Sequence, residues 1–198
     1  MIVLVDNGHG FDTPSKGSPD GILREWKYAR EIAAEVEKRL KEEGITTIRI
    51  VTEDKDVSLT QRVNRVNTIC KEFGAKNCCL VSIHLNAMPP NDNKWHTARG
   101  FCVMVSKNAS GRSKKLAQML YAQAEKNNLQ GNRCVPKEKY WVQNLAICRD
   151  TNCAAVLTEN LFQDNKEDVS YLLSLEGRNT IVDLHVKGII NYIKSVAA

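Results

Sequence analysis

Short apolar runs alternate with longer helical patterns along most of this chain. The runs that we expect to form strands cover residues 2–5, 46–51, 78–83, 100–105, 145–148 and 154–157. Apolar residues spaced three and four apart predict helices over 24–43, 59–73 and 111–124, and again around 181–193. Ser58 and Ser110 are suitable helix N-caps, and Gly44 and Gly74 are suitable helix ends.

This alternation predicts the fold class. Strands separated by helices form an α/β fold, here a twisted, mostly parallel sheet with helices on both faces. Polar or irregular segments over residues 7–21, 86–99 and 130–143 are expected to be loops. With 198 residues and no internal repeat, the chain has the length of one domain, which we expect to span residues 1–198. In such sheets, ligands bind at the carboxyl ends of the strands.

Composition excludes several classes of protein. The chain is 42% hydrophobic and 26% charged, which argues against disorder. The net charge is +5, but the basic residues are scattered over helical patterns and are not interleaved with aromatic residues, so we expect no nucleic-acid partner. No apolar run approaches the roughly 20 residues that a transmembrane helix needs. We expect a monomer.

The cysteines and the first residues bear on the compartment. The seven cysteines form no C-x-x-C pair, and we interpret them mostly as buried thiols of a reducing environment. The apolar run after Met1 is four residues long and ends at Asp6, which is too short for a secretory signal. We therefore expect the chain as written to be cytoplasmic, unless a leader has been removed from it.

Candidate catalytic residues follow three of the predicted strands. His9 lies shortly after the strand at residues 2–5, His84 after the strand at 78–83, and Glu159 after the strand at 154–157. Glu25 stands in the first turn of the first long helix. Two imidazoles and a carboxylate are a common ligand set for catalytic zinc, with a further carboxylate to transfer protons.

The same residues also fit ordinary structural roles. A histidine after a strand is often a satisfied packing residue, Glu25 suits a helix N-terminus, and Glu159 suits an ion pair at a strand end. The spacing of these residues matches no short motif such as H-E-x-x-H. Asp6 and Asn86 are candidates either for orienting ligands or for stabilising turns. The residue pattern alone leaves both interpretations open.

Four separated motifs occur in a specific order along the chain. They are Asp6-Asn7-Gly8-His9-Gly10, Gly21-Ile22-Leu23-Arg24-Glu25, Ser82-Ile83-His84-Leu85-Asn86-Ala87 and Glu159-Asn160-Leu161-Phe162. Together they resemble the zinc-dependent N-acetylmuramoyl-L-alanine amidases of the third amidase family. The resemblance covers nearly the whole chain. The chain departs from the family pattern at Asn7, where proline is usual, at Phe11, where glycine is usual, and at Asn160-Leu161-Phe162, near a usual Gly-Phe pair.

The resemblance implies an enzyme, a metal and a substrate. It implies that His9, Glu25 and His84 bind Zn²⁺ and that Glu159 is the catalytic carboxylate. It implies hydrolysis of the amide between N-acetylmuramic acid and L-alanine in peptidoglycan. Because the chain shows no repeat and no second zone of different composition, we expect no separate wall-binding domain. There are two alternatives. One is another zinc hydrolase, namely a peptidase that acts on cell-wall peptides, and the other is a non-catalytic wall-binding module.

Overall fold

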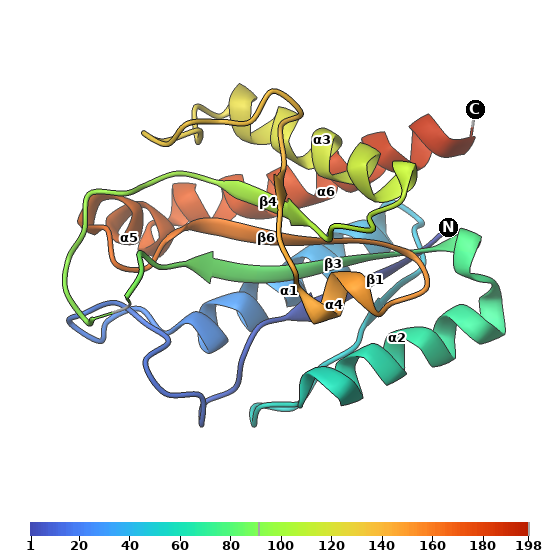
Figure 1. Cartoon of the computed structure of the whole chain (residues 1–198), viewed down its shortest axis with the longest axis horizontal. Helices are drawn as coiled ribbons and strands as arrows, with labels where there is room; N and C mark the ends of the chain where they lie inside the picture. Colours follow the sequence, from blue (N-terminus) through green and yellow to red (C-terminus); the bar gives the residue numbers. More distant parts are fainter. Residues whose placement is uncertain (91, 198) are drawn as a thin grey trace.

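The computed structural model describes residues 1–90 and 92–197 as one α/β domain (Figure 1). Its sheet has the strand order β2-β1-β3-β6-β4-β5. The strands are β1 (Ile2–Asn7), β2 (Thr47–Arg49), β3 (Cys78–Asn86), β4 (Cys102–Val105), β5 (Trp141–Val142) and β6 (Ala154–Phe162). Strands β2, β1, β3 and β6 are parallel, and the pair β4 and β5 runs in the opposite direction. The predicted mostly parallel α/β sheet is therefore confirmed.

Helices cover both faces of the sheet, as Figure 1 shows. They are α1 (Glu25–Glu42), α2 (Leu59–Phe73), the short 3-10 helix η1 (Ala75–Asn77), α3 (Gly111–Lys126), α4 (Ala146–Arg149), α5 (Lys166–Leu173) and α6 (Leu175–Ala197). Alternate residues of β1 and β3 pack into two separate cores, because successive strand side chains point to opposite faces. One core lies under α1, α3, α5 and α6, and the other under α2 and α4.

Local signals behave as predicted at the helix ends. The Ser58 side chain accepts a hydrogen bond from Gln61 N and completes a capping box, and Ser110 caps α3. Gly44 and Gly74 follow α1 and α2 with positive φ angles of 74° and 86°. The loop predicted at 86–99 lies between β3 and β4, apart from residue 91, which lies outside the described residues.

The prediction of a strand at residues 145–148 is wrong. These residues form the one-turn helix α4, in which the Leu145 carbonyl accepts hydrogen bonds from the amides of Cys148 and Arg149. A four-residue apolar run cannot distinguish a buried strand from a buried helical turn. The edge strand beside β4 is instead Trp141–Val142, inside the segment expected to be irregular.

Strands β3 and β6 are longer than their apolar runs predict. Both continue for several residues that include polar side chains, so that His84 and Glu159 lie within the strands and not beyond them. Helix α5, which the apolar periodicity does not predict, begins after Asn165, whose side chain accepts hydrogen bonds from the amides of Glu167 and Asp168.

Two general expectations can be compared with the described residues. None of the described helices has the length and apolarity that crossing a membrane would require. All seven cysteines are free thiols; five are buried, Cys153 is partly buried and Cys134 is exposed. The interpretation of the cysteines as mostly buried thiols is thus confirmed.

Candidate metal site at the sheet edge

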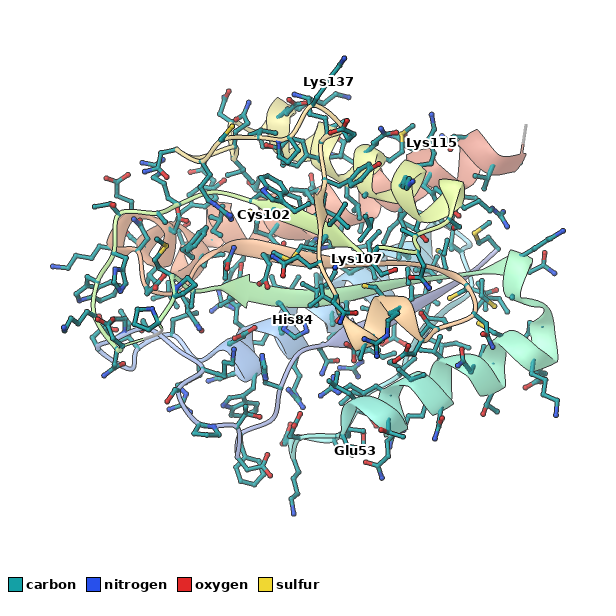
Figure 2. The ribbon with its side chains drawn as sticks, in the orientation of Figure 1. Glu53, His84, Cys102, Lys107, Lys115 and Lys137 are labelled. Carbon is teal, nitrogen blue, oxygen red and sulfur yellow. The ribbon has the colours of Figure 1, made fainter. Side chains whose placement is uncertain are left out.

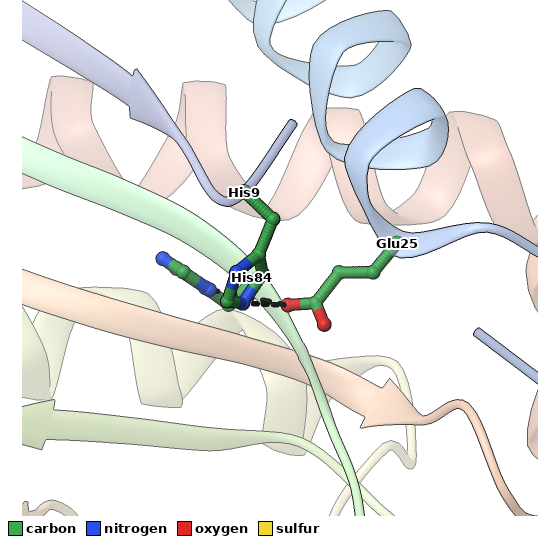
Figure 3. Close-up of side chains that lie close together, drawn as sticks. All are labelled: His9, Glu25 and His84. Atoms are coloured by element: carbon green, nitrogen blue, oxygen red, sulfur yellow. Dashed lines mark hydrogen bonds and ion pairs between the residues drawn. The ribbon is translucent and has the colours of Figure 1, made fainter. Parts of the chain in front are cut away.

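His9, Glu25 and His84 converge at one point from three separate segments (Figure 3). His9 follows β1, Glu25 is the first residue of α1, and His84 lies in β3. The Glu25 Oε1 atom lies 3.5 Å from His9 Nε2 and 3.1 Å from His84 Nδ1. One ligand atom from each residue lies within 4.8 Å of the other two, a spacing that suits a shared metal ion.

Glu159 lies on the strand beside His84. The two residues are register partners in the parallel pair formed by β3 and β6. Among the described residues, neither Glu159 Oε2 nor Glu25 Oε2 has a hydrogen-bond partner, although both atoms are buried. Buried carboxylate oxygens are costly without a partner, so their lack of one is consistent with a site built for a bound cation and a polar substrate.

Burial and charge shape the protonation of the four residues. Burial raises the pKa of Glu159 to about 7; the His84 ring opposes this rise, and the negative charge of Glu25 adds to it. Burial is the largest effect on both Glu25 and His84 and disfavours their ionisation, but their mutual hydrogen bond and the nearby opposite charges together outweigh it, so the pKa of Glu25 is lowered and that of His84 is raised. Burial lowers the pKa of His9 to about 4, which favours the neutral imidazole that a metal needs.

The loop that carries His9 is held by two arginines. His9 has a φ of 59°, a left-handed conformation that non-glycine residues adopt only at some cost. Its carbonyl accepts hydrogen bonds from Arg30 Nη1 at 2.8 Å and from Arg62 Nη2 at 3.4 Å. These bonds hold the strained backbone in the conformation that directs the imidazole toward Glu25.

Glycine is required immediately before His9. A Cβ atom at Gly8 would lie 2.3 Å from the His84 ring, much closer than side-chain atoms approach one another. The backbone of the first ligand loop therefore passes directly against the second histidine. This close approach explains why a glycine precedes His9.

Asp6 and Asn86 contact neither histidine ring directly. Asp6 is buried and accepts hydrogen bonds from Arg62 at 2.6 Å and from Ser82. Arg62 also bonds to the carbonyls of Asn7 and His9, so it links Asp6 to the loop that carries His9. Asn86 donates to Cys102 Sγ at 3.9 Å and accepts from the Ala87 amide.

The positions at which the chain departs from the resembled motifs lie around this site. Phe11 is exposed and packs edge-on against Trp26, and Leu161 is buried with a φ of 67°. Asn160 donates to the His84 carbonyl at 2.9 Å and so ties β6 to the ligand strand. Sequence reasoning missed the roles of Arg30 and Arg62, because a basic residue on a helix gives no sign that it is buried.

Comparison with known proteins agrees with this geometry. Residues 3–191 match the family model described as N-acetylmuramoyl-L-alanine amidase. The chain belongs to this family. A curated member of similar sequence is the endolysin of Bacillus phage SPP1, 29% identical over 195 residues, which cover 95% of this chain. The chain spans only 64% of that endolysin's length.

Proteins named as amidases resemble this chain in sequence and in fold. The germination-specific N-acetylmuramoyl-L-alanine amidase of Bacillus subtilis is 27% identical, with 96% of this chain and 79% of that protein covered. The crystal structure of an N-acetylmuramoyl-L-alanine amidase from Clostridium difficile 630 superposes with a TM-score of 0.82 at 23% identity. That superposition covers 98% of this chain and 97% of the other. The architecture is thus that of known amidase structures.

Proposed function

We propose that this chain is a zinc-dependent amidase of peptidoglycan. It hydrolyses the amide between the lactyl group of N-acetylmuramic acid and the L-alanine of the stem peptide. The observation that carries this proposal is the convergence of His9, Glu25 and His84 beside Glu159. Family membership supports the choice of bond.

The ligand set favours zinc. Two imidazoles and one carboxylate form the three-ligand arrangement typical of catalytic zinc, which leaves a position for water or substrate. We assign His9, Glu25 and His84 as these ligands. When bound, zinc polarises the substrate carbonyl and lowers the pKa of a coordinated water to about 7.

Glu159 supplies the proton transfer. Its buried Oε2 atom has no partner among the described residues and can accept a proton from the attacking water. The water oxygen forms a bond to the amide carbon, and the carbon–nitrogen bond then breaks. Glu159 passes its proton to the leaving nitrogen of L-alanine and returns to its carboxylate form.

Digestion of purified peptidoglycan tests the proposal. The protein is stripped with a chelator, reloaded with zinc and assayed by mass spectrometry of the products. We expect intact stem peptides that begin with L-alanine, and their release only after zinc is restored. Cuts within the stem would indicate a peptidase instead, and equal activity in excess chelator would contradict zinc dependence.

Variants separate the metal ligands from the proton carrier. Glu159→Gln should retain zinc by elemental analysis but lose activity by about 10²- to 10⁴-fold, the usual contribution of a general acid–base group. His9→Ala and His84→Ala should lose the zinc itself. Glu42→Gln, at the exposed end of α1, is the matched control and should behave as the wild type. Full activity of Glu159→Gln would contradict the role of Glu159.

A further inference from the structure

A hollow with a mixed polar and apolar lining begins where the two central strands pass the candidate metal site. Its volume is about 530 Å³, and its lining includes Asn86 of β3, Phe162 of β6, and Asn132 and Arg133 of the loop before β5. Asn86 and Phe162 are register partners that lie two and three residues beyond His84 and Glu159. The hollow is therefore positioned to receive the part of a substrate that extends away from the reacting bond.

Arg133 is held in this hollow without an acidic partner. Its guanidinium carbon lies 5.5 Å from the ring centres of both Trp141 and Phe162, and Nη1 donates to Cys102 Sγ at 2.8 Å. No carboxylate of the described residues forms an ion pair with Arg133, although the side chain is only partly buried. Because a guanidinium carries five N–H donors, most of its hydrogen-bonding capacity remains available.

The position of Arg133 relates it to the reacting bond. Cys102, to which Arg133 donates, is the register partner of Glu159 in the antiparallel pair of β4 and β6. A substrate held beside Glu159 therefore lies within the reach of this guanidinium.

We propose that Arg133 binds a carboxylate of the stem peptide, on the residue that follows L-alanine. A fixed guanidinium pairs with a carboxylate through two parallel hydrogen bonds, an arrangement that a neutral carboxamide cannot reproduce. The enzyme should thus prefer stem peptides that carry a free carboxylate at this residue over peptides in which it is amidated. This inference rests on the proposed amidase function.

A matched pair of substrates tests this preference. Two synthetic N-acetylmuramoyl tetrapeptides differ only in their second residue, which is D-glutamate in one and D-isoglutamine in the other. We expect the zinc-loaded wild type to cleave the carboxylate form with a kcat/KM roughly 10- to 100-fold higher, the value of a charge-assisted hydrogen bond. Arg133→Met should lose that preference, so that its kcat/KM values for the carboxylate and amide forms become equal.

A control variant and three contrary outcomes complete the test. Lys137→Met removes a positive charge from the same loop at an exposed side chain, which Figure 2 shows pointing away from His84, and it should keep the full preference. Equal cleavage of both substrates by the wild type would overturn the inference. So would an equal loss for both substrates in Arg133→Met, which indicates a structural role or an effect on Glu159. If the zinc-loaded wild type cleaves neither substrate, the proposed function itself fails, and the inference with it.

Discussion

The burial of His185 in α6 offers a quantitative test of the structure. His185 is fully buried, and its ring lies 2.8 Å from the Ile181 carbonyl and 3.0 Å from Thr158 Oγ1. Since the carbonyl can only accept, Nδ1 carries the hydrogen and Nε2 accepts from the threonine hydroxyl in the neutral ring. Burial lowers the pKa of His185 from 6.5 to about 4, against the opposing effect of the carbonyl.

This lowered pKa makes the free energy of unfolding depend on pH. Below pH 6.5 the unfolded chain takes up a proton at residue 185, while the folded chain resists protonation until about pH 4. The contribution of His185 to the free energy of unfolding is therefore fully present above pH 6.5 and is lost as the pH falls toward 4. The difference between a pKa of 6.5 and one of about 4 corresponds to about 3 kcal/mol of unfolding free energy.

The assay compares the wild type with His185→Gln, which cannot be protonated. Both proteins are unfolded with urea in excess chelator at several pH values between 7 and 4.5, so that the metal ligands titrate alike in each. The constant cost of the substitution cancels when only the change with pH is compared. The wild type should lose more stability than the variant, with the difference approaching about 3 kcal/mol toward pH 4. Parallel curves for the two proteins would refute the reasoning.

Two further substitutions test how the site is built. Gly8→Ala places a Cβ atom 2.3 Å from the His84 ring, so we expect much weaker zinc binding by titration while the circular dichroism spectrum stays native; unchanged affinity would show that the ring can move without cost. Arg62→Met leaves the buried Asp6 carboxylate without its cation, and we expect a loss of about 3–5 kcal/mol in unfolding free energy together with weaker zinc binding. A loss below about 1 kcal/mol would contradict the importance of this buried pair.

Much of the fold follows from periodicity, and the exceptions have physical reasons. Long helices such as α1 and α2 repeat their apolar spacing over many residues, and caps such as Ser58 mark their ends. The run at residues 145–148 is too short to carry a period, and the strand at Trp141–Val142 is only two residues long at the sheet edge. Helix α5 has a detectable signal, since Asn165 precedes two acidic residues in its first turn.

The candidate site, like the fold, is only partly predictable from the sequence. The carboxyl-end rule places His9, His84 and Glu159 at one edge of the sheet, and the geometry brings the histidines together with Glu25. The residues that support the site could not be found in this way. Arg30 and Arg62 both donate to the His9 carbonyl, although they lie 21 and 53 residues after it in the sequence. No local pattern distinguishes such arginines from those on a solvated helix face.

The wide separation of the proposed metal ligands along the chain would couple assembly of the protein to metal supply. Glu25 and His84 lie 59 residues apart, so an unfolded chain offers no prearranged site. A metal that binds only the folded state adds to its stability by mass action, about 4 kcal/mol when the free ion is at 1,000 times its dissociation constant. Metal scarcity would then enlarge the unfolded fraction that proteases attack. Zinc supply would govern the lifetime of the protein as well as its activity.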